Sequence, residues 1–299
     1  RTLDERYRIE RVLGEGGMGA VFVAEHLRLG KRVAVKIILP AHAGNADLAS
    51  RFAREAMVTA KLEHPHVVSA VDSGSLPEGG AYLVMTLAPG RSLRELIGTR
   101  SGWRLACDVG AQIADALTAA HAMGVVHRDL KPENVIVEER ADGSLHARVL
   151  DFGIARAVDA QTTTGGTPLT RIGTILGTPG YMPPEQALGD TADPRADLYS
   201  LGVVVWEMAS GRPLFPQGEL REIAVAQLTE PIPELPASDA PATLQPLLDA
   251  LLMPKREDRP GSALEVRDTL RRAALDAPRA LAPAATTEAA SVAERRIGP

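Results

Sequence analysis

The chain has little cysteine, few aromatic side chains and no long apolar run. Its single cysteine, Cys107, cannot form an internal disulfide, and a structural zinc site would need histidine and acidic ligands instead. Aromatic residues make up only 3% of the 299 residues, so aliphatic side chains and alanine must build most of the core. No apolar run reaches roughly 18 residues, so we do not expect this chain to span a membrane.

The charge balance is mildly acidic. Lysine and arginine number 33 and aspartate and glutamate 38, which gives a net charge of −5. This balance argues against a protein that binds nucleic acid by bulk charge. No signal peptide is recognisable at the start, which favours a cytoplasmic protein, or the cytoplasmic part of a larger membrane-anchored one. Because the first residue is Arg1 and not Met, we expect a fragment of a longer protein.

Hydrophobic patterning divides the chain into three parts. The first is expected to form short strands and one helix, at residues 7–13, 20–25, 32–39, 46–62 (the helix), 67–72 and 81–87. Helical stripes follow at residues 105–117, 198–208, 244–252 and 264–275. The last residues are rich in alanine and proline without periodicity, which is typical of a flexible tail. The predicted parts are residues 1–88, 89–275 and 276–299.

A glycine-rich motif, G-x-G-x-x-G, begins at Gly14 and ends at Gly19. Alone it is a weak signal, because an ordinary turn can have the same pattern. A dinucleotide-binding fingerprint needs a helix after the motif, but the residues that follow, 20–24, are β-prone. The motif is therefore expected to join two strands as a hairpin whose backbone amides can approach phosphate oxygens.

Lys36 lies on a strand that is otherwise apolar. Alternation places Ala34 and Lys36 on one face of this strand and Val33, Val35 and Ile37 on the other. A buried lysine is costly without a partner, so the ammonium either reaches solvent at an edge or pairs with a carboxylate. Glu55, in the predicted helix, is the candidate partner.

Two further motifs give the chain a family resemblance. Residues 127–134 read His-Arg-Asp-Leu-Lys-Pro-Glu-Asn, and residues 151–153 read Asp-Phe-Gly. With the glycine-rich motif and Lys36, these segments stand in the order found in protein kinases, so the chain resembles that family from about residue 7 to residue 275. The subgroup it resembles is the bacterial Hanks-type serine/threonine protein kinases. The implied fold is α+β, with a small antiparallel β N-lobe that carries one key helix and a larger helical C-lobe.

The resemblance implies a role for each motif residue in phosphoryl transfer. Asp129 would accept the proton of the incoming hydroxyl, and Lys131 would hold the γ-phosphate of ATP. Asn134 and Asp151 would hold Mg²⁺ (or Mn²⁺) through oxygen atoms. Lys36, paired with Glu55, would hold the α- and β-phosphates. The alternative for Asp129 is an aspartate that only caps its loop.

The resemblance also implies a nucleotide site between the lobes. Val21 and Ala34 would lie above the adenine and Ile136 below it. Met85 would guard the back pocket, and the backbone of Thr86 and Ala88 would pair with the adenine edge. The glycine-rich loop would cover the phosphates with Leu13, Gly14, Glu15, Gly16, Gly17, Met18 and Gly19.

Substrate class and regulation follow from the same resemblance. Lys131 favours serine and threonine acceptors over tyrosine, and Thr178 is expected near Asp129 and Lys131, although it could be a simple turn residue. Thr170 and Thr174 are the expected autophosphorylation sites, with Arg128 available to bind a phosphate. The expected partners are protein substrates and a second copy of the chain during autophosphorylation.

Two other functions remain open at this point. A pseudokinase scaffold would bind partners without turnover, but Lys36, Asp129, Asn134 and Asp151 are all present. A small-molecule phosphotransferase of related fold would generally lack a peptide-docking segment such as residues 177–181. Glu185 is expected to form a buried ion pair with Arg259, and Asp197 to accept backbone amides of the catalytic loop.

Overall fold

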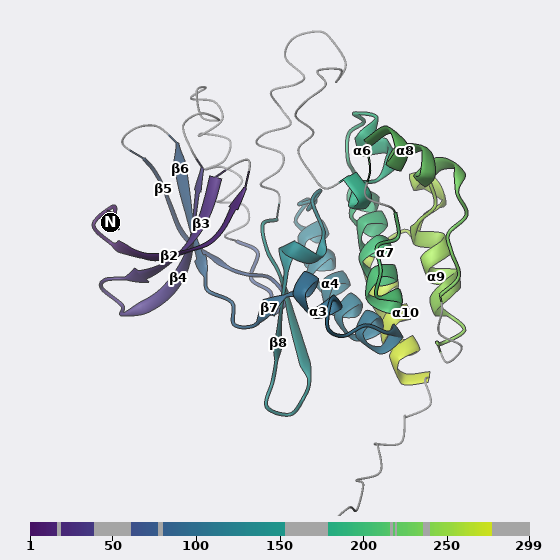
Figure 1. Cartoon of the computed structure of the whole chain (residues 1–299), viewed down its shortest axis with the longest axis horizontal. Coiled ribbons are helices and arrows are strands. Elements are labelled where there is room, and N and C mark those ends of the chain that lie inside the picture. Colours follow the sequence, from purple (N-terminus) through teal and green to yellow (C-terminus); the bar gives the residue numbers. More distant parts are fainter. Residues whose placement is uncertain are drawn as a thin grey trace, which may run out of the picture.

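The computed structural model describes residues 1–16, 19–38, 61–76, 80–152, 179–215, 218, 220–235 and 240–276. A six-stranded sheet forms one part of the molecule and a mainly helical part follows it (Figure 1). The expected α+β architecture, with a small antiparallel sheet beside a larger helical lobe, is confirmed.

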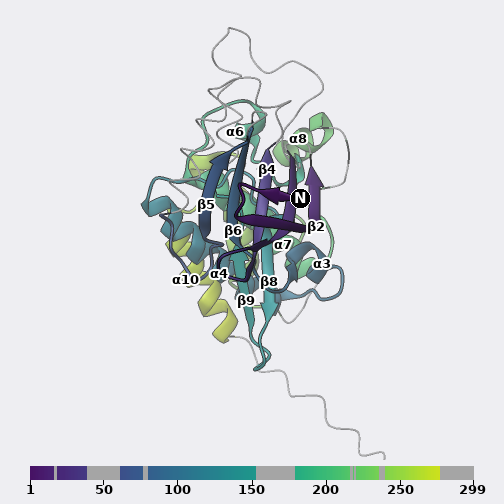
Figure 2. The same ribbon diagram turned by 90° about the vertical axis from the view of Figure 1, so that its left-hand side faces the viewer.

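The large sheet is antiparallel throughout, in the order β1-β2-β3-β4-β6-β5. Its strands are β1 (Thr2–Leu3), β2 (Tyr7–Gly16), β3 (Gly19–His26), β4 (Lys31–Ile38), β5 (Ala70–Ser75) and β6 (Ala81–Thr86). Figure 2, which faces the sheet, shows β4, β6 and β5 next to one another. Strands β2 and β3 form a hairpin in which Gly16 lies opposite Gly19, so the glycine-rich motif does join two strands.

Strand β4 has the predicted alternation. Val33 and Val35 are buried in one apolar cluster, together with Tyr82 of β6. Ala34 faces the other side, in a cluster with Leu83 and Met85. Each face of the sheet therefore has its own small core, and Lys36 shares the face of Ala34.

The strand expected at residues 67–72 begins later, at Ala70. Val67 and Val68 leave the sheet because they pair with the helical part. Val67 forms a parallel bridge with Val149, whose carbonyl accepts the amide of Val68 at 3.0 Å. The amide of Val149 donates to the carbonyl of His66 at 2.9 Å. The helix expected at 46–62 lies outside the described residues except for its last two.

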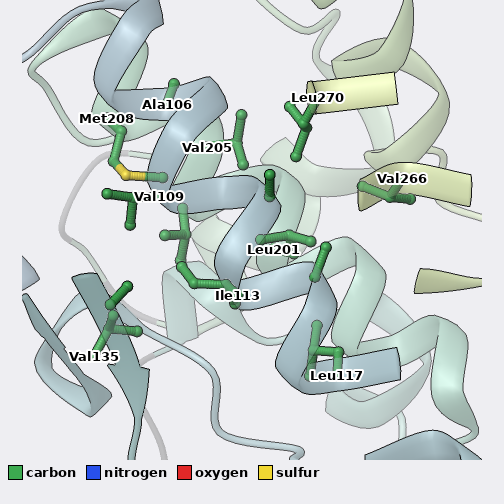
Figure 3. Packing of buried hydrophobic residues seen from close by; sticks show 14 of the residues in the cluster. Ala106, Val109, Ile113, Leu117, Val135, Leu201, Val205, Met208, Val266 and Leu270 are labelled. Carbon is green, nitrogen blue, oxygen red and sulfur yellow. The ribbon is translucent and has the colours of Figure 1, made fainter. Parts of the chain in front are cut away.

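The helical part is built around one long central helix. Its helices are α3 (Leu93–Ile97), α4 (Trp103–Ala122), α6 (Pro184–Ala187), α7 (Pro194–Ser210), α8 (Leu220–Thr229), α9 (Leu244–Leu251) and α10 (Ala263–Asp276). Helix α4 packs against both α7 and α10. Figure 3 shows Val109, Ile113 and Leu117 of α4 among Leu201 and Leu270 of those neighbours. The predicted stripe of α4 is thus its buried face.

A three-stranded sheet connects this core to the site. Its strands are β7 (Arg91–Ser92), β8 (Val135–Glu139) and β9 (Leu145–Val149). Gln112 of α4 binds the backbone of β9 at two points, since its side chain donates to the carbonyl of Leu145 at 2.9 Å and accepts the amide of Ala147 at 2.8 Å. The central helix therefore fixes β9, which ends two residues before Asp151.

None of the described helices has the length and apolar character that a membrane crossing needs.

Candidate active site

The site is centred on the loop between α4 and β8, which carries Asp129. The carboxylate of Asp129 accepts hydrogen bonds from Lys131 Nζ at 2.9 Å and from Asn134 Nδ2 at 3.1 Å. Asn134 Nδ2 also donates to the backbone carbonyl of Asp129 at 2.7 Å. The Asp129 side chain remains 37% exposed, so the carboxylate is oriented by the loop and still accessible to a second molecule.

The buried carboxylate of Asp197, in the first turn of α7, holds the start of this loop. It accepts the backbone amides of His127 and Arg128, each at 2.8 Å, and lies 2.8 Å from Nε2 of His121. The expectation that Asp197 binds backbone amides of the loop is confirmed. A fully buried carboxylate requires such donors, so removing Asp197 would release the loop.

His127 connects the loop to the residues around Asp151. Its Nε2 lies 2.8 Å from the carbonyl of Leu150, and its ring meets Phe152 edge-on with the centroids 4.8 Å apart. Phe152 and His127 are both fully buried. The contacts of His127 and Phe152 thus pack the loop that carries Asp129 against the segment that carries Asp151.

Asp151 lies directly across from Lys36. Lys36 Nζ donates to Asp151 Oδ2 at 2.7 Å, which joins the large sheet to the segment after β9. Both side chains are largely buried. Asp151 has a φ of 58°, an uncommon value for a residue with a side chain. Its Oδ1 is buried and has no hydrogen-bond partner among the described residues.

The donor set around Asp151 suits a hard cation. Magnesium is usually held by one or two protein ligands together with substrate phosphates, and it prefers oxygen atoms. Asp151 Oδ1, which has no hydrogen-bond partner among the described residues, is such an oxygen. Asn134, whose backbone carbonyl accepts the amide of Leu150 at 2.8 Å, carries a side-chain amide oxygen on the adjacent segment. Within the described ranges, no group of three or more His, Cys, Asp or Glu side chains is arranged so that it could hold a metal ion.

Several residues expected at the nucleotide site lie together on the inner face of the sheet. Ala34 and Met85 are buried in one cluster, and Val21 and Ala88 pack against it. Leu150, next to Asp151, joins the same cluster. The apolar surface thus extends from the sheet to the Lys36–Asp151 ion pair.

The other predicted residues have varied positions. Thr86 is exposed at the end of β6, and Ile136 is half-buried on β8. Leu13, Gly14, Glu15 and Gly16 end β2, and Gly19 begins β3. Glu55, Gly17, Met18, Thr170, Thr174 and Thr178 lie outside the described residues. The pairing of Lys36 with Glu55 stays a prediction.

Sequence reasoning missed a cluster beside the catalytic loop. Arg94 donates to Glu133 Oε1 of the loop at 2.8 Å, and also pairs with Glu207 and the hydroxyl of Tyr181. Tyr181 donates to Glu207 in turn, and burial, followed by this hydrogen bond, raises the pKa of Tyr181 above its usual value. These residues come from four distant segments, so no motif or spacing in the sequence could have found them.

The fold and this arrangement define a two-lobed protein in which the Lys36–Asp151 ion pair joins the lobes, and His127 of the Asp129 loop binds the adjacent carbonyl of Leu150. Residues 7–270 match the family described as the protein kinase domain, and the chain belongs to that family.

Curated relatives agree with this assignment. The serine/threonine-protein kinase pkn3 of Myxococcus xanthus is 36% identical over 93% of this chain and 53% of its own length. The serine/threonine-protein kinase PknA of Mycobacterium tuberculosis is 40% identical over 84% of this chain and 57% of its own length. The chain thus spans about half the length of these relatives.

Solved structures show the same fold. The PknI kinase domain of Mycobacterium tuberculosis superimposes with a TM-score of 0.67, at 25% identity, over 91% of this chain and 97% of that one.

Proposed function

We propose that this chain is the catalytic domain of a serine/threonine protein kinase, which transfers the γ-phosphate of ATP to hydroxyl groups of proteins. The observation that carries the proposal is the 2.7 Å ion pair between Lys36 of the sheet and Asp151 of the helical lobe. Family membership and the names of the curated relatives support the same activity. We also propose that residues 1–88 form the N-lobe, residues 89–275 the C-lobe and residues 276–299 a flexible tail.

In the proposed mechanism, Asp129 orients the acceptor hydroxyl and takes its proton. Its carboxylate is exposed enough to reach a substrate, while Lys131 and Asn134 fix its direction. Lys131, which contacts Asp129, is proposed to hold the γ-phosphate and to balance charge there. Positioning and charge neutralisation are the main tasks of the protein in phosphoryl transfer.

Asp151 and Asn134 would hold the magnesium ion, and manganese has the same preference for oxygen. When bound, the ion neutralises charge that develops on the β- and γ-phosphate oxygens. Asp151 Oδ1 has no hydrogen-bond partner in the described part of the chain, which supports this assignment because buried carboxylate oxygens normally have partners. Lys36 holds the other oxygen of Asp151 and faces the place proposed for the α- and β-phosphates.

The adenine is proposed to lie on the apolar cluster of the sheet, between Val21 and Ala34 on one side and Ile136 on the other. Met85 and Ala88 border the same surface. The backbone of Thr86 and Ala88 is proposed to pair with the adenine edge. Leu13 and the glycine-rich hairpin 14–19 would cover the phosphates.

The acceptor is proposed to be serine or threonine, because Lys131 and Thr178 stand where kinases of that specificity have them. The names of the curated relatives support this choice.

We further propose autophosphorylation on Thr170 and Thr174, carried out between two copies of the chain. Mass spectrometry after incubation with ATP tests these sites, and phosphate found only elsewhere would exclude them.

Since ATP is an intracellular nucleotide, we propose that the domain lies in the cytoplasm.

The central experiment measures transfer of radiolabelled phosphate from ATP to a generic basic protein. Wild-type protein should label it in the presence of magnesium, and EDTA should stop the reaction. Asp129→Asn should lower the rate by about 10²–10⁴-fold, the usual contribution of a general base, without changing the melting temperature. Nucleotide binding without transfer would indicate a pseudokinase scaffold, and transfer only to a metabolite would indicate a small-molecule phosphotransferase.

A further inference from the structure

Arg128, the residue ahead of Asp129, has a backbone conformation that needs support. Its φ of 69° lies in the left-handed region, which is unfavourable for a residue with a side chain. Its backbone amide and its backbone carbonyl are each bound by a side chain, one from α7 and one from α6. Its amide donates to Asp197 Oδ1 at 2.8 Å, and its carbonyl accepts a hydrogen bond from Gln186 Nε2 at 3.1 Å.

Gln186 belongs to α6, which is firmly attached to the helical lobe. The preceding residue, Glu185, forms a bidentate ion pair with Arg259, with both N–O distances 2.7 Å. Both charged side chains are buried. Because Glu185 is fixed in this way, the side chain of Gln186 starts from a fixed backbone position.

The carbonyl of Arg128 belongs to the peptide bond that leads directly into Asp129. A rotation of this peptide would move the Asp129 carboxylate away from Lys131 and Asn134. We propose that Gln186 is a positioning residue, which fixes the direction of Asp129 by holding the Arg128 carbonyl. This inference rests on the proposed kinase activity and adds to it a link from α6 to the proton acceptor.

The hydrogen bonding of the Gln186 side chain supports this positioning role. Its Oε1 is buried and has no hydrogen-bond partner among the described residues, whereas its Nε2 points at the Arg128 carbonyl. A buried amide oxygen without a partner is costly, so its presence in a folded protein calls for an explanation, and the positioning role supplies one. The hydrogen bond to the catalytic loop is the contact that the structure assigns to this side chain.

Two variants remove the contact in different ways. Gln186→Met keeps the approximate side-chain volume but removes the donor, and Gln186→Asn keeps an amide that is too short by one methylene. Both should lower kcat about tenfold, the scale of one lost hydrogen bond, with the KM for ATP unchanged. The proposed adenine contacts, Val21 and Ala34 on the large sheet and Ile136 on β8, do not include Arg128 or Gln186, so the KM for ATP should not follow kcat.

Gln227→Met is the matched control. Gln227 Nε2 donates to the carbonyl of Met182 at 2.9 Å, a hydrogen bond of the same kind in the same region, where α6 and α8 lie side by side (Figure 1). This variant should lower the melting temperature about as much as Gln186→Met but leave kcat unchanged. An equal loss of kcat in the control would reduce Gln186 to a structural role and overturn the inference.

A second measurement does not depend on activity. Hydrogen–deuterium exchange of a peptide spanning residues 126–131 should become faster in both Gln186 variants and stay unchanged in Gln227→Met. Unchanged exchange in the Gln186 variants would overturn the positioning role. If wild-type protein transferred no phosphate, the proposed function would fail, while the exchange result would still decide whether Gln186 holds the loop.

Discussion

Arg259 and Glu185 form a bidentate ion pair in the interior of the helical lobe, as the sequence predicted. The guanidinium has no exposed surface and also donates to the carbonyls of Met253, Arg195 and Pro254. It lies over the ring of Tyr199, 4.9 Å from the centroid. One side chain thus joins the segment before α10 to α6 and α7.

Loss of either partner of this pair should be strongly destabilising. Glu185→Ala leaves the buried Arg259 without its counter-charge, so the free energy of unfolding should fall by about 3–5 kcal/mol. Chemical denaturation measures the change. Arg8→Ala serves as the control, because the Arg8–Glu25 pair has a largely exposed arginine and should contribute less than about 1 kcal/mol. Similar losses in both variants would contradict this difference.

Gly110 permits the close approach of three helices in the core. A Cβ atom at this position would lie 2.9 Å from Val205 Cγ2 and 3.2 Å from Leu270 Cδ1. Gly110→Ala should therefore cost about 1–3 kcal/mol by overpacking, offset in part by up to about 1 kcal/mol of better helix propensity.

Gly98→Ala is the comparison for Gly110→Ala in thermal unfolding. The added Cβ of Gly98→Ala would meet nothing closer than 3.6 Å, and its backbone is right-handed helical. That variant should be neutral or stabilised by about 0.4–1 kcal/mol. A Gly110→Ala protein as stable as wild type would show that the three helices can move apart at little cost.

His66 makes stability depend on pH in the acidic range. Burial lowers the pKa of His66 from 6.5, as does the nearby His64, although a hydrogen bond to the Ala147 carbonyl and the charge of Asp115 act in the opposite direction. The unfolded chain therefore binds a proton at a higher pH than the folded protein. Stability should be constant above about pH 6.5 and fall as the pH decreases toward the folded pKa.

The free energy of unfolding measured between pH 5 and pH 7.5 tests this dependence. His66→Gln should flatten the slope, and His146→Gln should do so in part because burial also lowers the pKa of His146. A slope that stays the same in both variants would assign the pH dependence to other groups.

Asp151 should govern the response to magnesium. Asp151→Asn removes a charged oxygen ligand, so kinase activity should require more Mg²⁺ and should remain far below wild type at saturation. A magnesium titration at fixed ATP measures this. Asp142→Asn is the matched control, since Asp142 lies in the exposed turn between β8 and β9 and bonds only Ser144 among the described residues. It should leave the titration unchanged.

The sequence was most informative where chemistry requires particular residues in a fixed order. Asp129, Lys131 and Asn134 lie within one loop, so their proximity followed from the motif. The alternation of β4 likewise followed from its period of two, because Val33 and Val35 had to share a face.

Contacts between distant segments could not be predicted in this way. Val67 and Val68 have the pattern of a sheet strand, but they pair with β9 because that edge offers free backbone groups. Arg94 meets Glu133 and Glu207 only after three helical segments have packed, and the hydrogen bond from Gln186 to Arg128 has the same origin. Such pairs depend on tertiary packing, which local patterns do not encode.

The pairing of residues 66–68 with Val149 restricts how the two lobes can move. Among the described residues, the backbones of the two lobes are joined at two places, the chain at residues 87–90 and the hydrogen bonds of Val149 with His66 and Val68. A body held at two points keeps one easy rotation, about the line that joins them. Entry and exit of a nucleotide should accordingly proceed by a swing about this axis, with the hydrogen bonds of Val149 intact in the open and closed forms.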